Sequence, residues 1–216
     1  ANNFLQINPY AIVRLCEKFI DLGLPLNAVM YLEPFLSNEA WVSAVFECYL
    51  DALLVSEKFD LFLSRIVHLE QDEKTASINL REAQVYERLN KYELSIKSIR
   101  AAINISPHSP YSWHLLLRVS RAKGLSKEEI DNIVFEIPEV IFQSFDETKV
   151  PLVNEIAVYV DYNLADRILV DWFVQSPLKV ATVLTQIHIN SLSARPDVTK
   201  NPYTPQNCCD GVTYSD

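Results

Sequence analysis

Apolar residues recur along this chain with a spacing of 33 to 34 residues. If the repeats begin at Pro9, Ser43, Ala76 and Pro110, apolar side chains fall at matching offsets. The matching sets are Ile12, Phe46 and Trp113; Leu15, Tyr49 and Leu116; and Phe19, Leu53 and Tyr86. Self-similarity at this period is typical of stacked helical hairpins, in which each hairpin buries its apolar face against its neighbours. The pattern therefore predicts an all-α fold of the solenoid type.

Each repeat is expected to contain two helices. In the first repeat, apolar residues follow a helical period from Pro9 to about Leu22, and Gly23 then ends the helix as a glycine at its C-terminus. A second helix begins near Pro25, because proline is tolerated in a first helical turn. Pro34 should kink this second helix or end it early.

The third repeat has the clearest pattern, and the fourth repeat begins in the same way. Ala83 and Ser95 are small residues in the third repeat, which allows its two helices to cross closely. In the fourth repeat, Gly124 falls at the same offset as Gly23. Ser126 and Glu129 then have the spacing of a capping box, which predicts that a helix begins there.

The repeat phase is lost beyond about Pro138. Apolar periodicity still predicts helices near 150–160, 164–173 and 178–191, which would suit a capping or docking region at the end of the stack. After Ser193 the periodicity ends. We therefore predict helical repeats over 1–137, further helices over 138–193 and an irregular tail or linker over 194–216. Since the chain begins with Ala, we interpret it as a piece of a longer protein.

The four repeats resemble tetratricopeptide repeats, which are helical hairpins of about 34 residues. The third repeat carries the resemblance best. It has residues of the favoured kinds at Ala83, Tyr86, Tyr92, Ser95, Ile99, Ala102 and Pro107. The resemblance covers residues 9 to 137. It implies a right-handed superhelix whose concave face is lined by the first helix of each repeat and holds a peptide of a protein partner.

Helix-face counting places eight residues toward that concave face: Val13, Glu17, Glu47, Asp51, Leu80, Gln84, His114 and Arg118. Chaperone-binding members of the family grip a terminal carboxylate with Lys and Asn at positions that here hold Val13, Glu17, Glu47 and Asp51, so that clamp is absent. The predicted groove is acidic at its start. Its later part is basic, with Arg81, Arg88, His114, Arg118 and Arg121, and a partner of complementary charge would be steered to it. The alternative is a solvated helix face with i,i+4 ion pairs.

Composition excludes several other functions. The net charge of −9 argues against nucleic-acid binding, and no apolar run is long enough to predict a membrane span. Three glycines are too few for a glycine-rich phosphate loop. Four cysteines, of which Cys208 and Cys209 are adjacent, do not form a disulfide framework, and this favours a reducing, cytoplasmic setting.

We find no sequence pattern for catalysis, a metal or a cofactor. The four histidines have no carboxylate or cysteine at metal-ligand spacing. The Cys208–Cys209 pair lacks the spacer of a zinc knuckle, although an exposed pair could react with oxidants. We predict a non-catalytic interaction module that binds a peptide or helix of a protein partner. One alternative is a regulatory or sensor domain that controls a catalytic domain outside this chain. A weaker one is an enzyme with its site at the junction of the repeats and residues 138–193.

Overall fold

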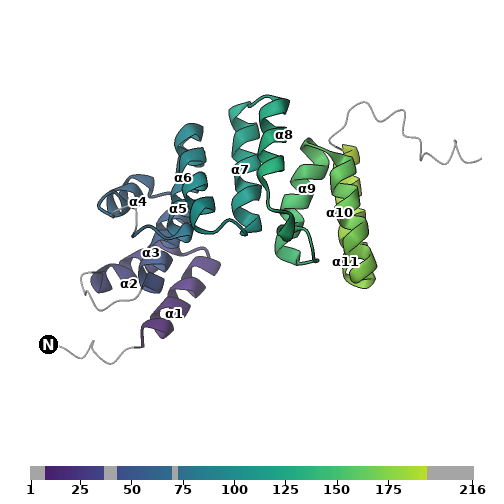
Figure 1. The fold of residues 1–216 in the computed structure, drawn as a ribbon. Helices are drawn as coiled ribbons and strands as arrows, with labels where there is room; N and C mark the ends of the chain where they lie inside the picture. Colours follow the sequence, from purple (N-terminus) through teal and green to yellow (C-terminus); the bar gives the residue numbers. More distant parts are fainter. Residues whose placement is uncertain (1–7, 37–42, 70–72, 194–216) are drawn as a thin grey trace, which may run out of the picture. The chain divides into compact units, whose positions relative to one another are not determined.

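The computed structural model describes residues 8–36, 43–69 and 73–193, and these residues form eleven α-helices, three short 3₁₀ helices and no strand (Figure 1). The chain forms two compact units, residues 1–125 and 126–216. In the first unit the α-helices are α1 (Pro9–Asp21), α2 (Pro25–Leu32), α3 (Ser43–Val55), α4 (Phe59–Ile66), α5 (Ala76–Arg88), α6 (Tyr92–Ile105) and α7 (Pro110–Lys123). In the second they are α8 (Lys127–Glu136), α9 (Val150–Tyr159), α10 (Tyr162–Gln175) and α11 (Pro177–Ser193).

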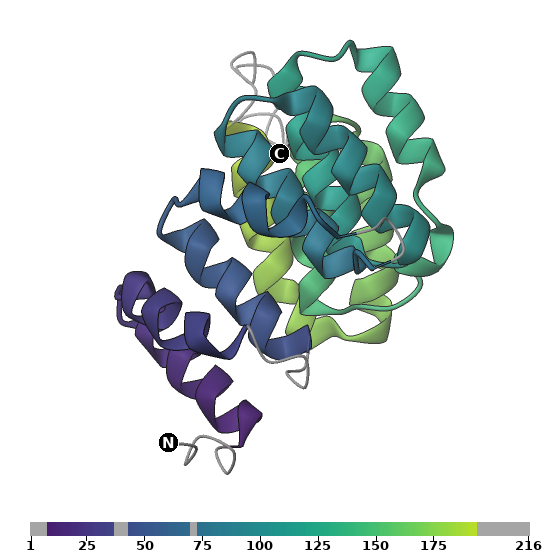
Figure 2. The same ribbon diagram turned by 90° about the vertical axis from the view of Figure 1, so that its left-hand side faces the viewer.

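Helices α1, α3, α5 and α7 begin at the four residues where the apolar pattern places the repeats. The prediction for the second helix is also confirmed, because α2 ends at Leu32 and passes into the 3₁₀ turn η2 (Glu33–Phe35), which contains Pro34. Pro34 has no N–H group to continue the helical hydrogen bonding. Helix α1 packs against both α2 and α3, so successive hairpins share one core (Figure 2).

The residue 14 positions after the start of each repeat has a left-handed backbone conformation, in all four turns that follow the first helices. Gly23 and Gly124 have φ angles of 73° and 85°, and Glu57 and Asn90 both have φ of 57°. Glycine adopts this conformation without a steric penalty, whereas the Cβ of other residues makes it costly. The turn geometry is therefore a property of the repeat, and it is imposed on residues less suited to it at Glu57 and Asn90.

The hairpin of α5 and α6 shows why small residues are needed at the helix crossing. Ala83 and Ser95 are both fully buried, and the Ser95 hydroxyl donates a hydrogen bond to the Ala83 carbonyl oxygen at 2.8 Å. A larger side chain at either position would force the two helices apart. The predicted close crossing is confirmed.

The second unit begins with a capping box. The Ser126 side chain accepts a hydrogen bond from the Glu129 backbone N–H, and the Glu129 carboxylate accepts one from the Ser126 backbone N–H, as predicted. Helix α9 begins later than the repeat spacing predicts, because the turns η3 (Glu139–Ile141) and η4 (Glu147–Lys149) precede it. Pro177, where α11 begins, falls two repeat lengths after Pro110. The start of α9 is therefore out of phase with the repeat, and the start of α11 is in phase again.

The segment between α8 and α9 is tied to α10. Trp172 is fully buried, and its indole N–H donates to the Phe142 carbonyl oxygen at 2.7 Å. The Phe145 ring meets the Trp172 ring edge-on, with 5.5 Å between the centroids. Helices α9, α10 and α11 pack against one another to form the core of this unit.

The boundary between the two compact units lies 12 residues before the predicted end of the repeats. The two units separate between Leu125 and Ser126, whereas the predicted repeats extend to residue 137, so α8 belongs with the C-terminal helices. The predicted tail over 194–216, including Cys208 and Cys209, lies outside the described residues.

Candidate functional site

The candidate site is the face of the first unit to which α1, α3, α5 and α7 contribute. We define this first-helix face by eight residues: Val13, Glu17, Glu47, Asp51, Leu80, Gln84, His114 and Arg118. Glu17 is exposed, and the other seven are half-buried. Half-burial of so many polar groups requires hydrogen-bonding partners, because an unpaired polar group away from water is costly.

Arg81 of α5 links that helix to α3. Its Nε donates to Asp51 Oδ1 at 2.5 Å, and one of its terminal nitrogens donates to Asp51 Oδ2 at 2.7 Å. The other terminal nitrogen donates to Glu47 Oε2 at 3.2 Å and also to the Ser77 hydroxyl. Ser77 in turn donates to Glu47 at 2.9 Å. One guanidinium group thus satisfies two carboxylates on the neighbouring first helix, with the two-point geometry that favours Arg over Lys.

The position of Arg81 affects its pKa in two opposing ways. Burial acts to lower the pKa, while the hydrogen bonds and negative charges of Asp51 and Glu47 raise it, and the net change is upward. The Arg81 side chain is 18% exposed, against 25% for Glu47 and 41% for Asp51. The pairing therefore lies in a zone where water screens charges less than at an open surface.

Helices α5 and α7 are linked in a similar way. Arg118 donates to both carboxylate oxygens of Glu87, with its Nε at 3.1 Å and a terminal nitrogen at 2.6 Å. Gln84 donates a hydrogen bond from its amide to the Tyr111 hydroxyl. Polar contacts of side chains thus connect three successive first helices across the face.

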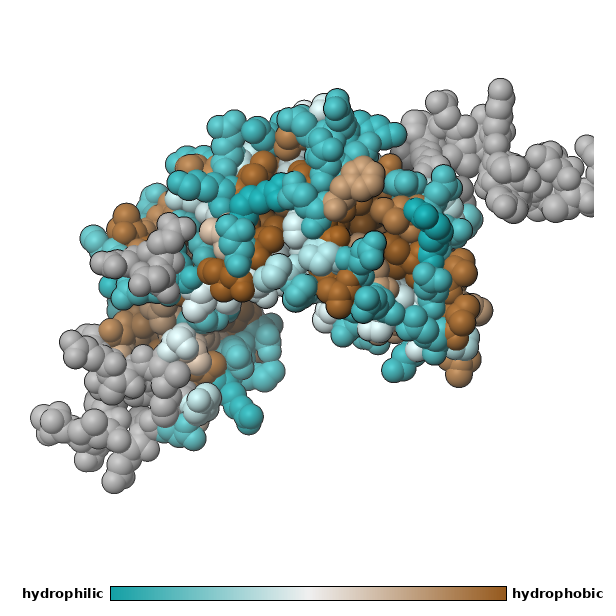
Figure 3. Space-filling model, viewed as in Figure 1, coloured by the Kyte–Doolittle hydropathy of each residue, from teal (hydrophilic) through white to brown (hydrophobic). Residues whose placement is uncertain are grey.

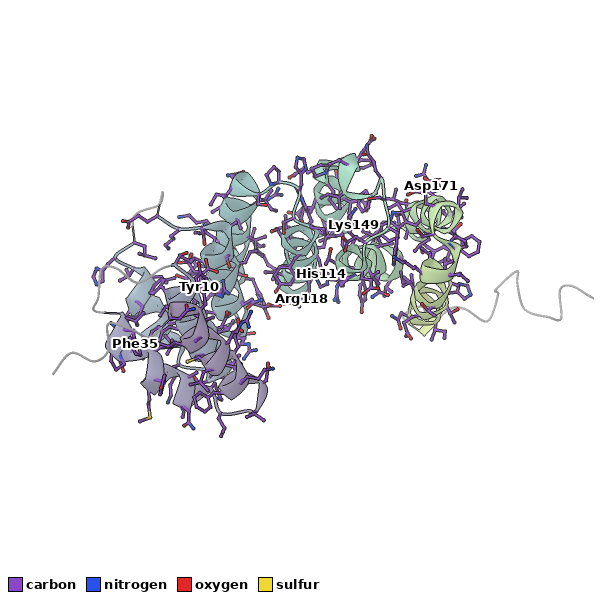
Figure 4. The ribbon with its side chains drawn as sticks, turned by 90° about the horizontal axis from the view of Figure 1, so that it is seen from below. Tyr10, Phe35, His114, Arg118, Lys149 and Asp171 are labelled. Carbon is purple, nitrogen blue, oxygen red and sulfur yellow. The ribbon has the colours of Figure 1, made fainter. Side chains whose placement is uncertain are left out.

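His114 lies on α7 one helical turn before Arg118, and the two residues lie close together in the view from below the stack (Figure 4). Its Nδ1 atom is buried and has no hydrogen-bonding partner among the described residues. Burial lowers the pKa of His114, the charge of Arg118 lowers it further, and Glu87 partly offsets both. His114 therefore favours its neutral form in the fold.

The remaining predicted site residues, Arg88, Arg121 and Glu17, are all exposed. Arg88 is exposed and meets Glu57 at 3.5 Å, a weak contact between two well-solvated side chains. Arg121 is exposed near the end of α7. Glu17 makes no hydrogen bond or ion pair with other residues of the described part of the chain.

The structure brings one predicted basic residue, Arg81, together with two predicted acidic residues, Asp51 and Glu47. Arg81 is neutralised by Asp51 and Glu47, and Arg118 is neutralised by Glu87. The paired residues come from different helices and are not the i,i+4 pairs of the alternative reading. Helix-face counting missed Glu87, Ser77 and Tyr111. Each of these three residues lies 27 to 31 residues from its partner along the chain, which is slightly less than the repeat length, and this spacing was the signal that could have identified them.

Other chemistry in the described residues is limited. Cys16 and Cys48 are buried free thiols, and burial raises the pKa of Cys16 to about 11 and that of Cys48 to about 12. Both thiols are therefore protonated and poorly nucleophilic at neutral pH. Within 8–36, 43–69 and 73–193, no three histidine, cysteine or carboxylate side chains are grouped so that they could hold a metal ion. No helix in the described ranges has the length and apolarity to span a bilayer.

No protein-family model matches this chain, and no curated protein matches it either. A solved structure is similar to this chain in its fold. It is a protein of Podospora anserina assigned as a kinesin light chain with nearly identical TPR-like repeats. The TM-score is 0.54 at 13% sequence identity, and the match covers 88% of this chain and 99% of that one. At this identity the likeness concerns the fold. The chain has an all-α, TPR-like helical-repeat architecture.

Proposed function

We propose that this chain is a non-catalytic interaction module that binds a peptide or helix of a protein partner across the first-helix face. The observation that carries the proposal is the half-buried polar surface running over α3, α5 and α7. Helical-repeat proteins use extended surfaces of this kind to bind other chains. The TPR-like architecture supports the same role, since folds of this type generally mediate protein interactions.

The ion pairs refine the expected chemistry of the partner. Glu17, Glu47 and Asp51 contribute three negative charges, and Arg81 balances one of them. The pair of Arg118 and Glu87 is neutral. A basic partner segment is therefore favoured over α1 and α3, and an uncharged polar segment over α7.

Charge reversal within an ion pair gives a sharp test. The double variant Glu87→Arg with Arg118→Glu preserves the pair between α5 and α7 but reverses the order of its charges. A second variant, Glu17→Lys, reverses an exposed charge that has no described partner. Proteins captured by the purified chain from a lysate of its source are compared by mass spectrometry for both variants and the wild type.

If the first-helix face binds the partner, both variants lose it while keeping the far-UV circular dichroism spectrum of the wild type. The exposed substitution Lys97→Glu on α6, a second helix, serves as the matched control and should retain the partner. Equal recovery of the partner by wild type, both variants and the control would rule out recognition through this face.

A further inference from the structure

Helix α1 exposes a side that the other first helices bury. The third, sixth, seventh and tenth residues of α3, α5 and α7 are all buried, apart from the half-buried Arg81. The seventh residues are Tyr49, Glu82 and Leu116, and the same place in α1 holds Leu15, which is 41% exposed. All four residues of this set are exposed in α1, and we define them as the α1 stripe: Ala11, Arg14, Leu15 and Lys18.

The positions of the α1 stripe are those at which a first helix contacts the hairpin before it. At the sixth position of α3, the Cys48 thiol donates a hydrogen bond to the Val13 carbonyl oxygen of α1 at 3.9 Å. At the sixth position of α5, Arg81 pairs with Asp51 and Glu47 of α3. Helix α3 also packs against both α1 and α2. The α1 stripe therefore has the position of an interface between hairpins, and no described helix precedes α1 to cover it (Figure 2).

Arg14 indicates the chemistry of the partner. It holds in α1 the place that Arg81 holds in α5, and the two carboxylates that Arg81 binds lie four residues apart on one helix. Arg14 is exposed and makes no hydrogen bond or ion pair with other described residues. Lys18, by contrast, pairs with Asp21 of its own helix at 2.8 Å. A guanidinium group binds carboxylates at two points, so the α1 stripe is suited to a helix with two acidic residues at this spacing.

Apolar surface accompanies this cation. Leu15 follows Arg14 in the α1 stripe, and its equivalents Tyr49 and Leu116 are fully buried in α3 and α7. Figure 3 shows hydrophobic patches between hydrophilic residues over the hairpin of α1 and α2. Burial of apolar surface supplies most of the free energy of such a contact, and the charges add specificity.

The sequence limits where an acidic partner helix can come from. It contains two pairs of acidic residues that lie four apart, Glu17 with Asp21 and Glu47 with Asp51. The first pair lies on α1 itself, and Arg81 already binds the second. Residues 1–8 contain no acidic residue. These facts favour a partner helix from outside this sequence over a second copy of the chain.

We infer that the α1 stripe is a docking surface for a helical hairpin from outside this sequence, which packs against α1 as one repeat packs against the next. The first helix of that hairpin presents two carboxylates, four residues apart, to Arg14 and an apolar side chain to Leu15. Val13 and Glu17 represent α1 in the first-helix face, and neither is part of the α1 stripe. The inference therefore goes beyond the function proposed above.

The test uses the full 216-residue chain and a displayed library of disulfide-closed helical hairpins in which one helix face is randomised. Enriched hairpins are synthesised with a fluorescent label, and their dissociation constants are measured by fluorescence polarisation. The test variants are Arg14→Glu and Leu15→Asp. The matched controls are Lys97→Glu on α6 and Met30→Asp on α2, both at exposed positions outside the α1 stripe. Far-UV circular dichroism checks that all four variants keep the fold of the wild type.

We expect enriched hairpins with two acidic residues four apart and an apolar residue beside them. Their dissociation constants should rise at least about tenfold for both test variants and change less than about twofold for both controls. Changing the two acidic residues of a hairpin to lysine should restore its binding to Arg14→Glu, which a folding defect could not produce. The inference is overturned if no hairpin is enriched, if the enriched hairpins lack the acidic pair, or if Arg14→Glu binds them as tightly as the wild type.

Sedimentation equilibrium tests the second copy as the occupant. The wild-type chain is expected to be monomeric, and a dimer that Arg14→Glu dissociates would overturn the inference. The double variant Glu87→Arg with Arg118→Glu, which tests the first-helix face, leaves the α1 stripe unchanged. It should bind the enriched hairpins as the wild type does, so a failure of the proposed function and a failure of this inference give different results.

Discussion

The contact between Arg81 and Asp51 gives a quantitative test of how the first helices are held together. In the substitution Arg81→Met, a side chain of similar length replaces the guanidinium group, and Asp51 and Glu47 lose their shared cation. Hydrogen bonds to charged groups contribute about 1.5 to 3 kcal/mol each, and exposed ion pairs about 0 to 1 kcal/mol. Since the Arg81 side chain is 18% exposed and that of Asp51 is 41% exposed, we expect each contact to contribute a free energy between these two ranges. We expect Arg81→Met to lower the free energy of unfolding by about 2 to 3 kcal/mol.

A double-mutant cycle isolates the pair itself. The free energy of unfolding is measured by urea titration with far-UV circular dichroism for wild type, Arg81→Met, Asp51→Asn and the double variant. The expected coupling energy is about 1 to 2 kcal/mol. Hydrogen exchange of the α3 and α5 amides is a second probe, because helical repeats can unfold one unit at a time.

The exposed pair of Arg65 and Glu33 provides the control cycle. Its side chains are 39% and 51% exposed and 2.8 Å apart, so its coupling energy should stay below about 1 kcal/mol. A coupling for Arg81 and Asp51 no larger than that of the control pair would refute the conclusion that these polar contacts hold α3 and α5 together.

Three further predictions follow from particular residues. Glu57→Gly removes a side chain from a left-handed turn and should raise the free energy of unfolding by about 1 kcal/mol in urea titration; a loss of stability would contradict the assignment of strain. Trp172→Ala should lower the free energy of unfolding by about 3 to 5 kcal/mol, because it empties a buried site and leaves the Phe142 carbonyl without its donor; a cost under about 1 kcal/mol would contradict this. His114 has a pKa below its ordinary 6.5 in the fold, so its contribution to stability is present above pH 6.5 and is lost as the pH falls through the folded pKa. His114→Gln should therefore flatten the pH dependence of stability below pH 6.5, and an unchanged slope would refute the burial argument.

Much of the fold could be predicted because the repeat imposes the same physical demands at each offset. The starts of α1, α3, α5 and α7, the turn at Gly23, the small pair of Ala83 and Ser95, and the capping box at Ser126 all follow from local rules of helix formation and packing. The structure adds that the positions equivalent to Gly23 in the second and third repeats, Glu57 and Asn90, also have a left-handed backbone conformation. That could not be predicted at Glu57, because glutamate does not favour the conformation, whereas asparagine, as at Asn90, adopts it more readily.

The candidate site could be predicted less well, because it depends on contacts between repeats. Helix-face counting placed Asp51, Gln84 and Arg118 on one side, but it treated each charge separately. Their partners come from a neighbouring first helix, and only the packing of the hairpins brings them into reach. The loss of phase after Pro138 hid the return of the pattern at Pro177 for a similar reason, since the segment before α9 contacts Trp172 of α10 through Phe142 and Phe145.

The most direct test of the central claim is to locate the bound partner on the first unit. A photo-crosslinking amino acid is placed at Glu17 on α1 in one version of the chain and at Lys97 on α6 in another, both at exposed positions. If the partner binds the first-helix face, it crosslinks through position 17 and not through position 97. Crosslinking through position 97 alone would contradict the account.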